Sequence, residues 1–425
     1  MKARLASFAA LIFLVGVGSF LAGMWTTYKA WWPWQKLDEI RAAWKSYRRT
    51  GLFLPEDSYA VRRPDAPNAR HVIHDPQRAA RGYWAVNRLD AQTGMHMFEL
   101  WSPEGELLNT FPIDHSRVLD HGRPEEFVHV ATLLPDGSVL VVWDDAPGMA
   151  RLDACGNPVW TRTDRIYHHS IERGMNGYWT WASAIWNGGE DQQMIRFDPQ
   201  TGEILEELDL IDDVILRSPE NALALKVPED FAFDRSTHFG DRADIFHPND
   251  LEELLPEMAP AFPMFEAGDL LISNRNIDQV AVIGRRDGRV KWGDYGPWHR
   301  QHDADFLPDG TIGVFSNNTD RFRSSIMVID PATGKARDQF HGTGIRFSSY
   351  IMGKHQLLPN GNWLIVSTME GRVIEAAPDG TIVREYNNLI DDRYNAIVPY
   401  AEFHPGDTMI DVAICGTDGK AKANQ

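Results

Sequence analysis

The stretch QHDADFLPDGTIGVF, residues 301–315, reads as a β-hairpin in which a Pro-Asp-Gly turn joins two apolar strands. Two further stretches repeat it, VHVATLLPDGSVLVVW at 128–143 and KHQLLPNGNWLIV at 354–366. Glycine supplies the positive φ that such turns need, and Pro with Asp or Asn suits the earlier turn positions. Each first strand also carries a histidine, six to eight residues before the glycine of the turn.

A second hairpin type alternates with the first, as in RFDPQTGEIL at 196–205 and VIDPATGKAR at 328–337. One hairpin of each type gives four antiparallel strands, which is one propeller blade. Five blades are counted, and they begin near His129, His169, His247, His302 and His355. We expect a sixth blade that joins the strands at 82–90 and 96–108 to TMIDVAIC, residues 408–415, because such a closure removes an open sheet edge. The predicted fold is an all-β, six-bladed propeller over residues 75–425, with seven blades as the alternative.

The N-terminus carries an uncharged apolar run, LASFAALIFLVGVGSFLAGMW at 5–25, after Lys2 and Arg4. The run is long enough to cross a bilayer as a helix, and longer than the core of most cleaved signals. We therefore predict a transmembrane anchor or signal segment at 1–25 and a Trp-rich juxtamembrane segment at 26–74.

Within the second segment, 36–49 has the pattern of a short amphipathic helix, lying either on the membrane surface or on the globular domain. The basic N-terminus favours a single-pass inner-membrane protein with its propeller in the periplasm, although basic residues after the span favour the opposite orientation.

Composition excludes some functions. The formal net charge of −18 argues against nucleic-acid binding, which needs a basic surface. The two cysteines, Cys155 and Cys415, have no metal-binding spacing and are either one disulfide of an oxidising compartment or two unpaired thiols. Three histidines suit zinc, but no carboxylate pattern accompanies them, so we expect neither a metal nor another cofactor.

The recurrent histidines are expected to meet at one mouth of the central channel, because the first strand of each propeller blade lines that channel. They are His129, His169 with His168 beside it, His247, His302 and His355. Together they would form a cationic or nucleophilic pocket, whereas any one of them alone also suits a structural hydrogen bond. Trp179, Trp181 and Tyr350 lie near blade starts and either stack on an aromatic substrate or pack between blades.

One part of the chain resembles the bacterial arylsulfotransferases. The resemblance rests on an H-x-N element in FHPND (246–250), the strand end SNRN (273–276), a Q-H-D element in QHDADF (301–306) and FSNNTDRFR (315–323). It covers about 245–335 well and 125–390 more loosely. It implies a six-bladed periplasmic propeller that transfers sulfate between phenols without 3′-phosphoadenosine phosphosulfate, through a sulfohistidine.

By position, His247 matches the histidine of the H-x-N element and His302 that of the Q-H-D element. Arg323, or its neighbour Arg321, matches the arginine that holds the sulfuryl group. His355, in the next blade, is the predicted nucleophile, with His302 as the alternative. Those four catalytic candidates are joined by substrate-binding candidates at His169, Arg321, Asn249 and His129.

The implied partners are a small-molecule aryl sulfate and a phenol, with a homo-oligomer or a membrane-complex partner left open. The chain departs from the family in a longer turn at 251–268, and in an apolar N-terminal segment where the family has a β-sandwich-like domain. Two alternatives remain: a non-catalytic, membrane-anchored propeller that binds or scaffolds, and a quinoprotein-type dehydrogenase, for whose eight blades the chain is short. Water in place of phenol as acceptor, which would make a sulfatase, also stays open.

Overall fold

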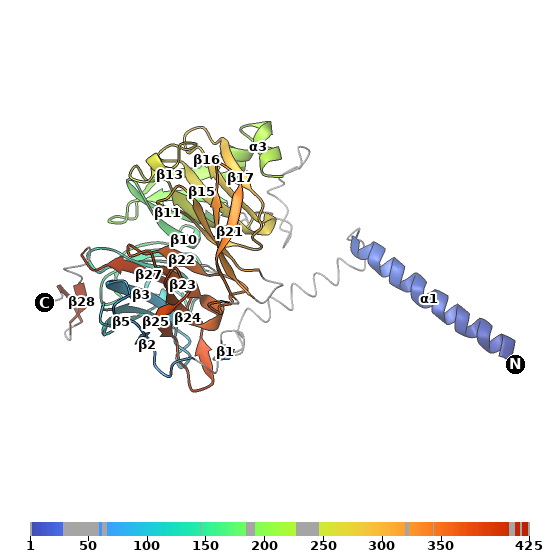
Figure 1. Ribbon diagram of the computed structural model, residues 1–425, viewed down its shortest axis with the longest axis horizontal. Helices are drawn as coiled ribbons and strands as arrows, with labels where there is room; N and C mark the ends of the chain where they lie inside the picture. The colour runs from blue at the N-terminus through green and yellow to red at the C-terminus, as the bar shows by residue number, and fades with distance from the viewer. Residues whose placement is uncertain are drawn as a thin grey trace. The chain divides into compact units, whose positions relative to one another are not determined.

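The computed structural model describes residues 2–28, 59–61, 66–144, 146–183, 192–226, 246–318, 323–342, 344–407, 413–416 and 419–423. The chain divides into two units, residues 1–57 and 58–425. The first unit contains helix α1 (Lys2–Tyr28), and the second contains every described strand (Figure 1).

Helix α1 forms where the sequence predicts a helix, and it exposes large apolar side chains along its length. Across the described residues, however, no helix combines the length and the apolar content needed to cross a membrane. The predicted transmembrane helix at 1–25 is therefore not supported. The predicted amphipathic helix at 36–49 lies outside the described residues.

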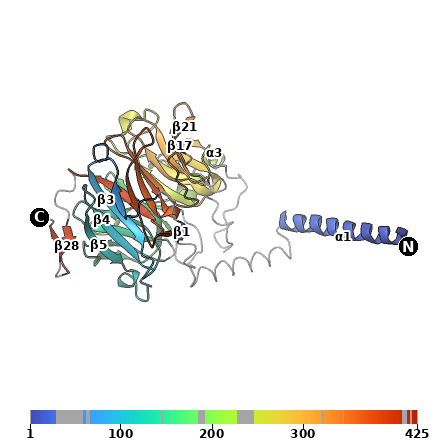
Figure 2. The ribbon, with the colours of Figure 1, turned by 60° about the horizontal axis from the view of Figure 1, so that its bottom comes forward.

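Six antiparallel sheets follow one another around a central channel and form a β-propeller (Figures 1 and 2). The predicted all-β fold with six blades is confirmed. Blades 1 to 3 consist in turn of β6 (Val128–Leu133), β7 (Val139–Trp143), β8 (Met149–Leu152) and β9 (Pro158–Arg162); β10 (Ile166–Gly174), β11 (Gly177–Ser183), β12 (Gln193–Phe197) and β13 (Ile204–Asp209); and β14 (Pro248–Glu253), β15 (Leu270–Asn274), β16 (Gln279–Ile283) and β17 (Val290–Asp294).

The remaining three blades have the same design. Blade 4 is β18 (His302–Phe306), β19 (Ile312–Ser316), β20 (Ser325–Asp330) and β21 (Lys335–His341). Blade 5 is β22 (Lys354–Leu357), β23 (Trp363–Ser367), β24 (Arg372–Ala376) and β25 (Ile382–Asn387), with β2 (His71–Ile73) as a fifth, outer strand. Blade 6 is β27 (Tyr400–Pro405), β3 (Gly82–Leu89), β4 (His96–Trp101) and β5 (Leu107–Ile113).

Smaller elements decorate the propeller. They are the pair β1 (Tyr59–Val61) and β26 (Tyr394–Ala396), the C-terminal hairpin β28 (Ala413–Cys415) and β29 (Ala421–Ala423), a π-helix at Leu210–Ile215 and helix α3 (Pro219–Ala224). The Pro-Asp/Asn-Gly turns form as predicted, because Gly137, Gly310 and Gly361 take φ values of 84°, 82° and 83°. Side chains with a Cβ rarely adopt this conformation, which is why glycine recurs there.

The closing strand of blade 6 differs from the prediction. Residues 408–415 were expected to close the ring, but β27 pairs with β3 instead, in a register from Tyr400 with Asn87 to Pro405 with Gly82. Of the expected strand, Ala413–Cys415 pairs with β29 in a separate hairpin, and 408–412 lies outside the described residues. β28 pairs with β29, and the ring is closed by the strand Tyr400–Pro405, which comes earlier in the chain. The principle of closure by a C-terminal strand on N-terminal strands is confirmed; the strand is a different one.

Side chains also connect the inner strands of adjacent blades around the channel. In each case a carboxylate on one inner strand accepts a backbone N–H from the inner strand of the next blade. The pairs are Asp250 with Ala304 (2.8 Å), Glu252 with Phe306 (2.6 Å) and Glu402 with Leu133 (2.6 Å). These bonds satisfy donors that no ladder partner reaches, because inner strands of different blades do not share a sheet.

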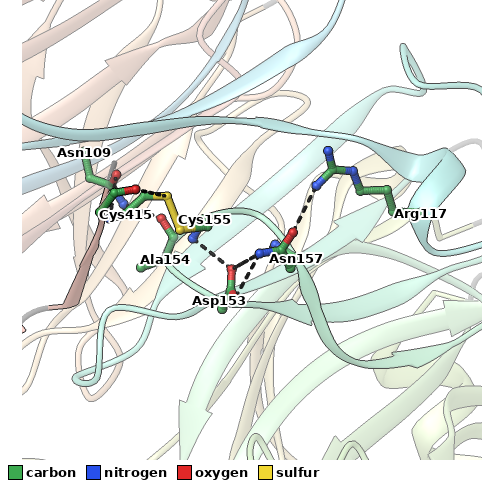
Figure 3. The surroundings of a disulfide bond; sticks show 8 residues. Asn109, Arg117, Asp153, Ala154, Cys155, Asn157 and Cys415 are labelled. Carbon is green, nitrogen blue, oxygen red and sulfur yellow. Dashed lines mark hydrogen bonds between the residues drawn. A yellow bond between two sulfur atoms is a disulfide. The ribbon is translucent and has the colours of Figure 1, made fainter. Parts of the chain in front are cut away.

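Cys155 and Cys415 form a disulfide, so of the two alternatives left by the sequence the structure has the bridge (Figure 3). The bridge fastens the C-terminal hairpin to the β8–β9 turn of blade 1. Asn109 joins the same point, because its Nδ2 donates to the Ala154 carbonyl at 2.7 Å and its Oδ1 accepts the Cys415 N–H at 3.4 Å. The bridge therefore joins the last part of the chain to blade 1, next to strand β5 of the closing blade.

Candidate functional site

A cavity lies at one mouth of the channel, and every blade contributes to it through its inner strand or the residue just before that strand. Its lining consists of His129, His169, Ser170, Glu172, Asn249, Asp250, His302, Asp303, Gly353, Lys354, Pro399 and Tyr400. The predicted convergence of histidines is found for His129, His169 and His302. Of the predicted substrate-binding residues, His129, His169 and Asn249 line the cavity.

Local breaks in strand pairing bring these side chains to the cavity. In β6, β10, β14 and β18 the register with the neighbouring strand shifts near the channel mouth. The residues that the shifts leave unpaired are His129, His169 with Ser170, Asn249 and Asp303. A bulge re-aims the side chain that it carries. His169 and Asp303 also take positive φ values of 65° and 49°, a conformation that costs about 1–3 kcal/mol and often marks functional sites.

His302 is buried and its ring is held by one amide. Its Nδ1 lies 2.6 Å from Oδ1 of Asn317. The Nδ2 of Asn317 donates to the carbonyls of Ser349 at 2.8 Å and Met352 at 2.5 Å, so its Oδ1 is an acceptor and the proton of His302 is on Nδ1. Burial and then the nearby Arg275 guanidinium lower the pKa of His302 to about 3. The ring is therefore neutral near pH 7, with its lone pair on Nε2, which accepts the Met352 N–H at 3.3 Å.

His129 is held in the same way, but by a carboxylate. Its Nδ1 lies 2.6 Å from Oδ2 of Asp144, fifteen residues later in the sequence. Burial disfavours the charge on Asp144, but His129 and then His169 outweigh it and hold the pKa of that carboxyl well below its usual range. A histidine beside a fixed carboxylate is well suited to accept and return a proton, because the carboxylate stabilises the imidazolium.

A row of imidazoles connects the remaining histidines. The ring centroids of His129 and His169 are 4.9 Å apart, and those of His169 and His247 are also 4.9 Å apart. Nδ1 of His168 lies 2.5 Å from Nδ1 of His169. Burial lowers the pKa of His169 well below the usual histidine value, although Asp144 raises it. His247 is thus beside the cavity, in contact with a lining residue, and does not itself line it.

His355 lies elsewhere. It is fully buried, its ring stacks on Trp363 at 5.6 Å between centroids, and its Nδ1 lies 2.6 Å from Oδ2 of Asp303. It pairs with Ile365, the position that Ala304 takes opposite Val314 in blade 4. The predicted nucleophile therefore occupies a core position between blades and is not among the cavity-lining residues.

The predicted arginines do not enter the cavity lining either. Arg323 is exposed, and Arg321 lies outside the described residues. Trp179 and Trp181 take the packing alternative, because they are fully buried in the core between blades 2 and 3. Tyr350 is exposed and is not among the cavity-lining residues, so neither alternative is shown for it.

Lys354 supplies the positive charge within the lining. Its Nζ donates to Oε1 of Glu172 and to Oδ1 of Asp303, at 2.8 Å each. Burial opposes the ammonium charge, but Asp303 and then Glu172 outweigh it and raise the pKa of Lys354 well above its usual value. The pKa of Asp303 is held at about 2, where Lys354 and His355 overcome the effect of burial. Burial, then Asp303 and Glu172, raise the pKa of Asp250 well above the usual range.

Sequence reasoning missed the partners Asp144 and Asn317, the cations Lys354 and Arg275, and the acidic groups. A signal for the first two exists. In both Pro-Asp-Gly hairpins the partner lies fifteen residues after its histidine, at the end of the second strand, and the turn sets that register. No comparable spacing identifies Lys354, whose partners come from blades 2 and 4.

Comparisons with known proteins agree with the resemblance noted in the sequence. A family model described as Arylsulfotransferase (ASST) matches residues 130–389. A search of curated proteins gives no match.

Three solved structures with similar folds illustrate the structural comparison. A protein of unknown function from Bacteroides caccae has 11% identity and a TM-score of 0.47, over 76% of this chain and 98% of that one. TolB from Acinetobacter baumannii has 12% identity and a TM-score of 0.45, over 76% and 66%. A streptogramin B lyase has 11% identity and a TM-score of 0.41, over 79% and 97%. At these values the likenesses carry no functional argument.

Proposed function

The chain belongs to the arylsulfotransferase family, and on that premise we propose that it moves a sulfuryl group from an aryl sulfate to a phenol, with His302 as the histidine that carries the group in between. Family membership favours this activity over the scaffolding alternative. The observation that carries the choice of histidine is that His302 lines the cavity, whereas His355 is enclosed in the core.

The nucleophile needs a neutral imidazole with an available lone pair. The bond from Nδ1 of His302 to Asn317 and the lowered pKa of about 3 support a neutral ring with its lone pair on Nε2. Nε2 now accepts the Met352 N–H at 3.3 Å, and this bond must break before Nε2 attacks sulfur. In the first step Nε2 attacks sulfur, the S–O bond to the aromatic ring breaks, and its electron pair leaves on the phenolate oxygen. In the second step the oxygen of the acceptor phenol attacks sulfur and the S–N bond breaks, which restores the neutral ring.

A proton must reach the departing phenolate and later leave the acceptor phenol. We assign this role to His129, because Asp144 holds its Nδ1 at 2.6 Å and stabilises the imidazolium. The imidazolium gives its proton to the phenolate oxygen, and the neutral ring takes one back from the acceptor. Arg275 does not itself line the cavity, but it is close enough to lower the pKa of His302 and is our candidate for stabilising the charge on the sulfuryl oxygens.

The test is release of 4-nitrophenol from 4-nitrophenyl sulfate by the purified chain, with and without added phenol. We expect release that depends on phenol, complete loss of it in His302→Asn, and retention of activity in folded His355→Asn. Mass spectrometry of the stopped reaction without phenol should find a sulfuryl group on the peptide that contains His302. A label on His355 instead, or loss of activity only in His355→Asn, would reject the assignment; release without phenol would indicate hydrolysis.

We also propose that the propeller works in an oxidising compartment, the periplasm. The support is the Cys155–Cys415 disulfide, because such bonds persist in oxidising environments and are rare in the cytosol. Thiol alkylation of freshly collected cells, before and after reduction, tests it: cysteines that alkylate without reduction would contradict this location. Attachment to the inner membrane, a homo-oligomer and a membrane-complex partner stay predictions.

A further inference from the structure

Carboxylates from the inner strands of three consecutive blades, β10, β14 and β18, gather among the residues that line the cavity. One oxygen each from Glu172, Asp250 and Asp303 lies within 4.8 Å of the others. In a calcium site, two oxygens on opposite sides of the ion at about 2.4 Å each are about 4.8 Å apart. The spacing therefore fits three ligands of one hard divalent cation without any movement of the strands.

Asn249 gives a second, independent indication. Its side chain is 4% exposed, and its Nδ2 donates to the Gln301 carbonyl at 2.8 Å, which fixes the orientation of the amide. Its Oδ1 is buried and lacks a hydrogen-bond partner among the described residues, and Asn249 is one of the residues that line the same cavity. A buried acceptor without a partner costs about 1–3 kcal/mol, and amide oxygens are common ligands of Ca²⁺.

The charges of the lining point the same way. Fully ionised, Glu172, Asp250 and Asp303 carry three negative charges against the single ammonium of Lys354, an excess of two, although burial and the neighbouring carboxylates raise the pKa of Asp250 and favour its protonated form when no cation is bound. One divalent cation neutralises that excess, which a further hydrogen bond to a neutral group does not. We propose that Asn249, Asp250, Glu172 and Asp303 bind one hard divalent cation, of which Ca²⁺ is the type, in the cavity.

Lys354 competes with this cation. Its ammonium takes one oxygen of Glu172 and one of Asp303. Asp250 contributes from another strand. Its Oδ2 accepts the Ala304 N–H, which leaves Oδ1 to bind the cation. The proposal therefore predicts two opposite effects on cation affinity. Removing the positive charge of Lys354 should strengthen cation binding, and removing the negative charge of Asp250 should weaken it.

The experiment is titration calorimetry of the full chain, freed of metal by a chelator, with CaCl₂ and with MgCl₂ and no substrate. We expect one Ca²⁺ per chain, weaker Mg²⁺ binding, and a rise in the thermal unfolding midpoint with Ca²⁺. Asp250→Asn, which keeps an acceptor for Ala304, should weaken binding about tenfold or more, and Lys354→Met should strengthen it. Asp309→Asn, in an exposed turn, is the matched control and should bind like the parent chain.

If Asp250→Asn fails to fold, Asn249→Ala replaces it, because it removes one ligand oxygen and no charge. Absence of Ca²⁺ binding at millimolar concentration, or equal affinity in Asp250→Asn, Asn249→Ala and the control, overturns the proposal. If Lys354→Met does not bind Ca²⁺ more tightly than the parent chain, the position assigned to the cation beside Lys354 is wrong. Because substrate is absent throughout, these outcomes are separate from the success or failure of the sulfuryl-transfer assay.

Discussion

Asp144→Asn tests the proton-transfer role of His129 without changing the shape of the site. The substitution leaves an amide oxygen beside Nδ1 of His129, where Oδ2 of Asp144 now lies at 2.6 Å, and removes the negative charge. It also removes the long bond in which Oδ1 of Asp144 accepts the His169 N–H at 3.3 Å. A hydrogen bond to a charged group contributes about 1.5–3 kcal/mol and a neutral one about 1 kcal/mol. The lost stabilisation of the imidazolium is thus about 0.5–2 kcal/mol, and its midpoint of about 1.25 kcal/mol corresponds to nearly tenfold in kcat.

The assay compares two donors, phenyl sulfate and 4-nitrophenyl sulfate, each with a saturating phenol acceptor. A poor leaving group needs the proton more, so the loss should be near tenfold with phenyl sulfate and smaller with 4-nitrophenyl sulfate. His129→Asn should cost about a hundredfold with phenyl sulfate. Adding Asp144→Asn to it should cost nothing more, because the two side chains act as one unit.

Asp120→Asn, an exposed aspartate before blade 1, is the matched control and should match the parent chain. The reasoning is refuted if Asp144→Asn loses the same factor with both donors, if it loses nothing, or if the losses of the single variants multiply in the double variant. Loss of folding, checked by the thermal midpoint, would separate a structural effect from a chemical one.

Three further predictions concern stability. Burial lowers the pKa of His96 to about 3, so its native ring binds fewer protons than the unfolded one between pH 6.5 and 3. The unfolding free energy should therefore fall on acidification in that window, by about 1.4 kcal/mol per pH unit for this group, and the denaturation profile of His96→Gln should be flatter. Removing the disulfide with Cys155→Ser and Cys415→Ser should cost about 2–4 kcal/mol in urea unfolding, an effect that a reductant should reproduce in the parent chain. Gly313→Ala would put a Cβ 2.4 Å from Nε2 of His355, so a lower thermal midpoint is expected; an unchanged midpoint would mean that the core there yields.

The turn residues made the hairpins of each blade predictable from the sequence, but they did not identify the strand that closes the ring. The hairpins could be found because Pro, Asp and Gly at the turn set the register, and the register sets which strand positions face each other. The closing strand could not be identified, because β27 mixes polar with apolar residues, β28 is a short apolar run, and only the whole ring decides which one meets β3.

The positions of the histidines in their strands were likewise predictable from the sequence, but the directions of their side chains were not. His302 precedes a shift of register at Asp303, whereas His355 sits in a strand that pairs without a shift. Side chains alternate between the faces of a strand, so one unpaired residue moves every later side chain to the other face. Sequence spacing treated the two histidines as equivalent, and a bulge that no motif announces sends one to the cavity and the other to the core.

The closure of blade 6 has a consequence for how the protein is made. Strands β3, β4 and β5 are among the first to leave the ribosome, but their inner partner β27 is synthesised only after the other five blades. Until then the first sheet has an exposed edge, and contacts across most of the chain length form late and slowly. A chain that ends before β27 is therefore an open ring in which β3 lacks its inner partner, and it should bind holding chaperones until that strand is made.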